Sequence, residues 1–118
     1  MEQKQAHIGA DLLMPAVEQY ICNEYRAGKL QELAHQTGYS ASALSRLIKK
    51  ETGLTFKELQ TRQRMKRVLC LLRDTGQPIR EVALLVGYEN SSYFYKQFER
   101  AFGMRPKEAR QKLQGYAS

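Results

Sequence analysis

The chain has 118 residues, and its 42% hydrophobic content suffices for one domain or for two small domains that share a helix. The 19 lysines and arginines outnumber the 12 acidic residues, and the net charge of +7 indicates a polyanionic partner such as nucleic acid. No apolar run approaches the roughly 20 residues of a membrane span. The amino terminus also lacks a secretory signal, so a cytoplasmic protein is expected.

Residues 1–10 are polar and aperiodic, which predicts a disordered lead-in. From about residue 11 to residue 25, apolar side chains recur at the spacing of a helix with one buried face. Pro15 is compatible with this helix because it lies near the start. The inward positions are Leu13, Val17, Tyr20 and Ile21.

Two shorter helices follow, and they are separated by Gly38, which suits a left-handed helix end. A short helix, a glycine turn and a second helix from about Ser40 make a helix-turn-helix motif. The inward positions are Leu30, Leu33 and Ala34 in its first helix and Leu44, Leu47 and Ile48 in its second.

A long linker helix is predicted from Thr55 to about Arg73, and Thr55 with Glu58 forms a capping box at its start. Its ends are apolar and its middle, TRQRMKR, is basic, so we expect the ends to pack into neighbouring subdomains and the middle to lie bare. About 19 residues span roughly 28 Å. This length is close to the roughly 34 Å between successive major-groove faces on one side of a duplex.

A second helix-turn-helix motif follows the linker helix. Pro78 suits a first helical position and Gly87 ends the first helix. A final helix from Pro106 to Leu113 packs through Ala109 and Leu113, and the tail GYAS is expected to fray. The inward positions of the motif are Ile79, Val82, Ala83 and Val86 in its first helix and Phe94, Phe98, Ala101 and Phe102 in its second.

The two motifs are an internal repeat. Their residues match at an offset of 49 up to the glycine turn and of 50 beyond it. In each motif the outer side of the second helix carries a hydroxyl and two cations at four-residue spacing, which suits a groove of nucleic acid. The matched rows are Ser42, Arg46 and Lys50 in the first motif and Ser92, Lys96 and Arg100 in the second.

The pattern from Leu30 to Arg110 resembles the DNA-binding region of the AraC/XylS family of bacterial transcription regulators. The residues that carry the resemblance include Leu33-Ala34, Gly38-Tyr39-Ser40, Leu44, Arg46, Lys49, Gly53, Arg64, Leu71-Leu72, Ile79, Val82-Ala83, Gly87-Tyr88, Ser92-Tyr93-Phe94, Phe98, Gly103, Pro106 and Arg110. The resemblance implies an all-α fold of about seven helices, in which two helix-turn-helix subdomains place their recognition helices in adjacent major grooves. The expected limits are 1–10 for the lead-in, 11–54 for the first subdomain, 55–74 for the linker helix and 75–118 for the second subdomain.

By motif position, the resemblance also implies which residues touch double-stranded DNA. Lys49 and Arg100 fall where backbone contacts are usual, and Lys50, far along its helix, is expected near the backbone too. The expected base-reading residues are Ser42, Ser45 and Arg46 in the first motif and Ser91, Ser92, Tyr95 and Lys96 in the second.

Three positions depart from the family pattern. Glu99 stands where a lysine is common, Arg105 replaces a small hydroxyl residue before Pro106, and Val68 replaces an alanine. A carboxylate at position 99 opposes phosphate, which makes the first motif the expected anchor. Many relatives carry an effector or dimerisation domain before this region, so the chain is expected to be a stand-alone regulator or the C-terminal part of a longer one.

Enzymes are disfavoured because no nucleophile motif, phosphate loop or carboxylate pair occurs. His7 and His35 suggest no metal site, no cofactor is expected, and His35 is expected at the surface. Cys22 and Cys70 lie in apolar runs, so buried reduced thiols are expected, and alkyl transfer to cysteine is disfavoured. The alternative function is a protein-interaction module that contacts RNA polymerase or a partner regulator.

Overall fold

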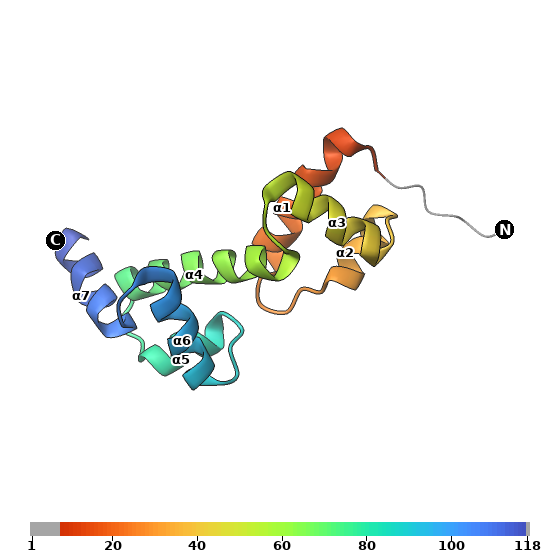
Figure 1. Ribbon diagram of the computed structural model, residues 1–118. Coiled ribbons are helices and arrows are strands. Elements are labelled where there is room, and N and C mark those ends of the chain that lie inside the picture. Colours follow the sequence, from red (N-terminus) through yellow and green to blue (C-terminus); the bar gives the residue numbers. More distant parts are fainter. Residues whose placement is uncertain (1–7, 118) are drawn as a thin grey trace. The chain divides into compact units, whose positions relative to one another are not determined.

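The computed structural model describes residues 8–117, with the side chains of residues 8–115. Seven helices and no strand occur in the described part of the chain (Figure 1), which confirms the predicted all-α fold. The helices are α1 (Ala10–Glu24), α2 (Leu30–Thr37), α3 (Ala41–Thr52), α4 (Phe56–Asp74), α5 (Ile79–Leu85), α6 (Ser91–Phe102) and α7 (Pro106–Ala117).

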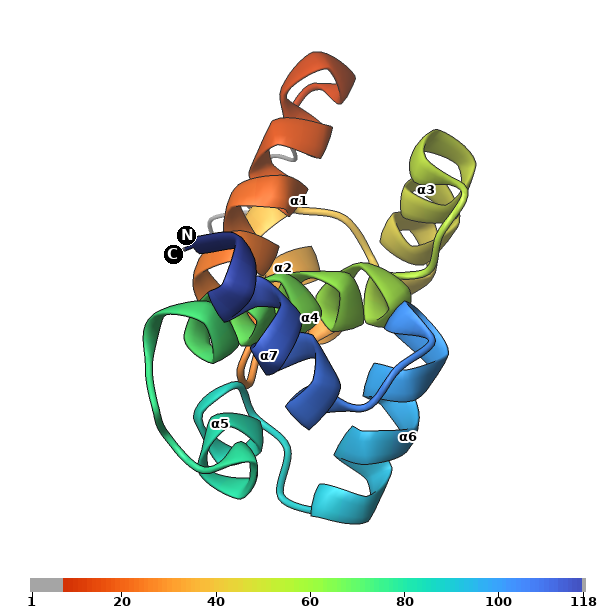
Figure 2. The same ribbon diagram turned by 90° about the vertical axis from the view of Figure 1, so that its left-hand side faces the viewer.

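The chain divides into two compact units, residues 1–61 and 62–118, which are called unit 1 and unit 2 below. Each unit contains one helix-turn-helix motif. In unit 1 the motif is formed by α2 and α3, which pack against each other, and in unit 2 by α5 and α6 (Figures 1 and 2). The finer subdomain limits expected from the sequence stay a prediction.

A left-handed glycine ends the first helix of each motif. Gly38 has φ +82° and Gly87 has φ +107°, a conformation in which a side chain would be strained. The next residue, a tyrosine in both motifs, donates its backbone N–H to the first helix: Tyr39 to Ala34 O at 3.1 Å, and Tyr88 to Ala83 O at 2.9 Å. The two turns therefore share one backbone design.

Aliphatic side chains dominate the core of unit 1. The four positions predicted to face inward from α1 are buried, as are Leu33, Ala34, Leu44 and Ile48. At the edge of this core the Tyr20 hydroxyl donates to Glu32 Oε1 at 2.5 Å and accepts from the Lys29 backbone N–H at 2.8 Å. Burial and the hydrogen bond to Glu32 raise the pKa of Tyr20. This hydroxyl ties α1 to the start of α2.

The described part of the expected lead-in is held against unit 1. The Ile8 backbone N–H donates to Thr37 O at 3.1 Å, the Tyr39 hydroxyl donates to Ile8 O at 3.0 Å, and Ile8 packs on the core. The prediction of disorder through residue 10 is therefore wrong for residues 8–10, because contacts with α2 and its turn fix them. Residues 1–7 lie outside the described residues.

The core of unit 2 combines aliphatic side chains with the rings of Tyr88, Phe94 and Phe98. Rings follow one another along α6, with centroids 6.0 Å apart for Phe94 and Phe98 and 4.6 Å apart for Phe98 and Phe102. Ala101 was expected on the same buried face, but it is exposed. The next residue, Phe102, packs its ring against Phe98 instead.

The linker helix α4 begins with the predicted capping box. Thr55 Oγ1 accepts from the Glu58 backbone N–H at 3.0 Å, and Glu58 Oε1 accepts from the Thr55 backbone N–H at 2.9 Å. The expectation of a bare basic middle is wrong in part. Met65 is only 3% exposed, and the half-buried Arg64 lies over the Tyr88 ring at 4.9 Å from its centroid. The guanidinium is drawn in because the ring face attracts a cation.

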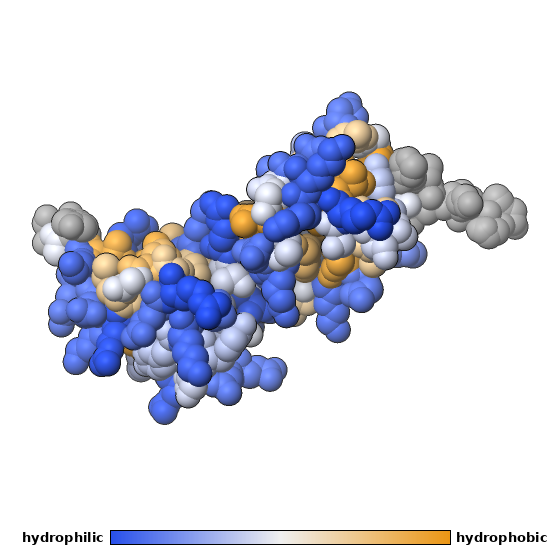
Figure 3. Space-filling view, in the orientation of Figure 1, coloured by the Kyte–Doolittle hydropathy of each residue, from blue (hydrophilic) through white to orange (hydrophobic). Residues whose placement is uncertain are grey.

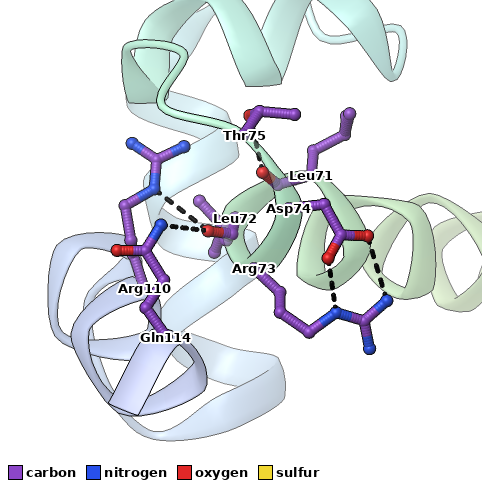
Figure 4. A network of polar contacts seen from close by, with 7 residues as sticks. All are labelled: Leu71, Leu72, Arg73, Asp74, Thr75, Arg110 and Gln114. Carbon is purple, nitrogen blue, oxygen red and sulfur yellow. Dashed lines mark hydrogen bonds and ion pairs between the residues drawn. The ribbon is translucent and has the colours of Figure 1, made fainter. Parts of the chain in front are cut away.

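Two side chains of α7 fasten it to the end of α4. Arg110 Nε and Gln114 Nε2 both donate to Leu72 O, at 3.2 and 3.3 Å (Figure 4). They satisfy a carbonyl in the last turn of α4, where no helical N–H is available. Beside them the Arg73 guanidinium, 2.7 Å from Asp74, lowers the pKa of that carboxyl.

Several local expectations need correction. Pro78 is the residue before α5 and not its first residue, and α5 ends at Leu85, although Val86 is buried as predicted. The final helix continues beyond Leu113 to Ala117, so the expected fraying of GYAS is wrong at its first three residues, and Ser118 lies outside the described residues.

Neither cysteine forms a disulfide, and the two differ in burial. Cys22 is exposed, which contradicts the expected burial, and Cys70 is half-buried. The reason is geometric, because Cys22 follows the last inward residue of α1 by one position and one residue turns the helix by about 100°. His35 is exposed, as expected.

Hydrophilic side chains cover most of the visible face of each unit, with small hydrophobic patches between them (Figure 3). Within residues 8–117, no helix combines the length and the apolar character that a membrane crossing requires.

Candidate nucleic-acid interface

The outer face of α3 is the first half of the candidate interface. Ser40 caps the helix, since its Oγ accepts from the Ala43 backbone N–H at 3.1 Å, and Leu44 and Ile48 anchor the opposite face in the core. The orientation of α3 is thus set by its cap and its buried side, and not by its exposed side chains. All five residues expected to contact DNA from this helix are exposed: Ser42, Ser45, Arg46, Lys49 and Lys50.

The outer face of α6 is the second half. Asn90 caps this helix, since its Oδ1 accepts from the Tyr93 backbone N–H at 3.0 Å, and Phe94 and Phe98 anchor it. Ser91, the first residue of α6, is only half-buried, and the other expected contact residues are exposed: Ser92, Tyr95, Lys96 and Arg100. Each unit therefore gathers its expected residues on one solvent-facing side of one helix.

The charges around the two helices differ. In unit 1, Lys49 Nζ donates to Gly53 O at 3.1 Å, close to the head of α4. The Thr55 backbone N–H, and to a smaller extent Lys49, lower the pKa of Glu58 there. In unit 2 the counterpart of Lys49 is Glu99, and Arg105 Nε lies 3.5 Å from Glu99 Oε2.

Sequence reasoning missed two features of this region. It treated Glu99 and Arg105 as separate departures, although Lys49 and Thr55 match them at the same repeat offset and could have linked them. It also gave Tyr93 no contact role, although this residue is 53% exposed in the first turn of α6. Tyr93 precedes the inward Phe94 by one position, and this offset of about 100° around the helix could have indicated its exposure.

The described residues offer no competing site for metal chemistry. Among them, no group of three or more histidine, cysteine or acidic side chains could hold a metal ion.

Two helix-turn-helix units, each with an exposed and basic second helix, define the chain as a DNA-binding module of the helix-turn-helix class. The family model described as "Helix-turn-helix domain" matches residues 33–112. The chain belongs to this family, as found in AraC-type transcription regulators. The family consists of regulators, which confirms the prediction that the chain is not an enzyme.

Individual relatives agree with this assignment. The chain is 33% identical over 103 residues to the HTH-type transcriptional activator RhaR of Pectobacterium atrosepticum, covering 87% of this chain and 35% of that protein. The C-terminal domain of AraT, a response regulator from Geobacillus stearothermophilus, has a TM-score of 0.78 at 34% identity, covering 87% of this chain and 86% of that one. The fold also matches an AraC-type regulator from Chromobacterium violaceum, with a TM-score of 0.79 at 24% identity over 87% of this chain and 92% of that one.

The chain therefore spans about a third of the length of the RhaR protein that it matches. The resemblance stated from the sequence is confirmed for the family and the fold. The assignment of individual residues to DNA stays a prediction.

Proposed function

We propose that this chain binds double-stranded DNA at specific sequences, with α3 and α6 reading two adjacent major-groove segments. One observation carries the proposal: in both units the second helix of the motif is anchored by two buried apolar residues and exposes hydroxyls and cations on its other side. The proposed base-reading residues are Ser42, Ser45, Arg46, Ser91, Ser92, Tyr95 and Lys96, and the proposed backbone contacts are Lys49, Lys50 and Arg100.

Arg46 is the strongest candidate for base discrimination. Its planar guanidinium can donate two hydrogen bonds to O6 and N7 of guanine, whereas serine hydroxyls accept several bases. Lys50 and Arg100 lie one turn further along their helices, where the backbone flanks the groove. The loss of a base contact and the loss of a backbone contact should therefore change DNA binding in different ways.

For the whole protein we propose a bacterial, cytoplasmic transcription regulator associated with the nucleoid. The length of RhaR, and solved relatives that are C-terminal domains of response regulators, support an effector or dimerisation domain upstream of this region. Because both reading helices lie on one polypeptide, a single chain can occupy a site without two-fold symmetry. One chain per duplex is the expected stoichiometry of its footprint.

A second candidate function is contact with RNA polymerase or a partner regulator. Leu84 and Leu85 of α5 favour it, because they are 54% and 42% exposed and stand next to each other. Apolar side chains exposed in this way suit a protein surface better than a phosphate backbone. The two functions are compatible, since they use different helices of unit 2.

The proposal is tested by comparing Arg46→Ala with Lys50→Ala on a DNA site selected from a random duplex library. We expect Arg46→Ala to cost about 1–3 kcal/mol on the selected site and to flatten discrimination at one base pair. Lys50→Ala should weaken all sequences alike and lower the slope of log affinity against log salt by about one. Fluorescence anisotropy across a salt series measures both quantities.

Lys29→Ala is the matched control, because it removes an exposed cation of unit 1 outside α3. It should leave base discrimination unchanged. If the affinity of the wild type for a random duplex does not depend on salt concentration, the result argues for the protein-interaction module instead.

A further inference from the structure

The recognition helix of each unit borders a hollow lined by the same three positions of the repeat. In unit 1 a hollow of about 870 Å³ is lined by Ser45, Lys49 and Thr55, among others. In unit 2 a hollow of about 480 Å³ is lined by their counterparts at offset 50, which are Tyr95, Glu99 and Arg105. The two hollows are one feature present in two copies.

Among these three matched positions, the cation stands at a different place in each copy. In unit 1 this cation is Lys49, on the recognition helix, which lines the hollow together with Arg46 and Lys50, and the residue before the next helix is the neutral Thr55. In unit 2 the recognition helix carries Glu99, and the cation is Arg105 at the head of α7. Arg105 Nε lies 3.5 Å from Glu99 Oε2, so the two residues that differ in charge from their unit 1 counterparts form an ion pair.

Stability does not explain this exchange. The Arg105 and Glu99 side chains are 78% and 50% exposed, and ion pairs as exposed as this contribute little to folding. The arginine also removes half of a capping box. Arg105 still donates its backbone N–H to Glu108 Oε1 at 3.1 Å, but it has no acceptor for the Glu108 N–H, whereas Thr55 accepts from Glu58 at α4.

We propose that Arg105 is a further DNA-backbone cation of unit 2, besides Arg100, with the role that Lys49 has in unit 1, and that Glu99 is a positioning residue for Arg105. The inference rests on the proposed DNA binding. Glu99 pairs with Nε of Arg105, which leaves the two terminal guanidinium nitrogens to grip a phosphate as a fork. Lys107 lines the same hollow and adds a second cation. Glu99 thus directs the Arg105 cation toward phosphate, and its carboxylate does more than repel phosphate.

The test exchanges the residues of the two units and follows binding to a random-sequence duplex, because backbone contacts do not depend on sequence. Arg105→Thr should weaken binding and lower the salt slope by about one. The double variant Glu99→Lys with Arg105→Thr recreates the unit 1 arrangement and should restore both quantities. Lys112→Thr, which removes an exposed cation of the same helix, is the control and should leave the slope unchanged.

The positioning role of Glu99 is tested by whether a second substitution raises the affinity for DNA. Glu99→Gln should tighten binding in the Arg105→Thr background, where the carboxylate only repels phosphate, and should fail to tighten it in the wild type. Equal tightening in both backgrounds would overturn the positioning role, because Glu99 would then act independently of Arg105.

The Arg105→Thr variant distinguishes an effect on folding from an effect on DNA binding. Arg105→Thr restores a side-chain cap to α7, so its melting temperature should hold or rise while its DNA binding falls. A wild type with a steep salt slope and an Arg105→Thr variant with the same slope would overturn the inference alone. A wild type with no salt slope would overturn the proposed function first.

Discussion

Unit 1 fills the interior of its motif with Leu44 and Ile48, whereas unit 2 fills the equivalent positions with Phe94 and Phe98. Both pairs are fully buried, although the side chains differ in volume and shape. The backbone features are the same in both units: a left-handed glycine, a tyrosine N–H bonded to the first helix, and a polar cap on the second.

The tyrosine after the glycine shows the same contrast. Tyr39 is half-buried and its hydroxyl donates to the carbonyl of Ile8, so the segment before α1 supports the first turn. Tyr88 is buried, with its ring 5.3 Å from that of Phe94 and with Arg64 over its face. The motif therefore fixes where apolar side chains must lie, and the surroundings of each unit decide which ones fit.

The largest expected effect comes from deleting a ring of unit 2. Phe98→Ala should destabilise the protein by about 3–5 kcal/mol, because the ring packs between Phe94 and Phe102 and leaves a cavity. Ile48→Ala, at the equivalent position of unit 1, should cost about 2–5 kcal/mol. Urea denaturation followed by circular dichroism measures both. A cost for Phe98→Ala well below that of Ile48→Ala would show that the aromatic core collapses around the gap.

The cation over Tyr88 lies in unit 2, and its removal gives the next largest effect. Arg64→Ala should lower the free energy of unfolding by about 1–3 kcal/mol, because it removes a half-buried charge from its aromatic partner. Arg62→Ala, two residues earlier and exposed, should change stability by no more than about 0.5 kcal/mol. Equal melting temperatures for these two variants would contradict a bracing role of Arg64.

The smallest effect concerns the capping box that only unit 1 has in full. Thr55→Ala should cost about 1 kcal/mol, since the Glu58 N–H loses its acceptor. The folded pKa of Glu58 is lowered from 4.5, so its contribution is present above about pH 4.5 and is lost as the pH falls through the lowered value. The stability gap between wild type and Glu58→Gln should therefore shrink below pH 4.5, as measured by thermal melts across pH. A gap independent of pH would contradict the capping role.

The sequence by itself determined the helices, the two motifs and the repeat. These follow from local patterns: the spacing of inward residues such as Leu44 and Ile48, a glycine where the backbone turns left-handed, and a capping box at Thr55. Such signals depend on residues within one or two helical turns, so they can be read before the chain folds. The matched outer rows of α3 and α6 follow from the same periodicity.

Only the tertiary structure decided which side chains meet across the fold. The cation of Arg64 over Tyr88, the pairing of Arg105 with Glu99 and the anchoring of Ile8 by Tyr39 all join different elements. Periodicity reports which way a side chain points, but not what stands opposite it, because that partner comes from another part of the chain. For the same reason the apolar pattern misplaced Ala101, since an inward direction buries a side chain only where another element covers it.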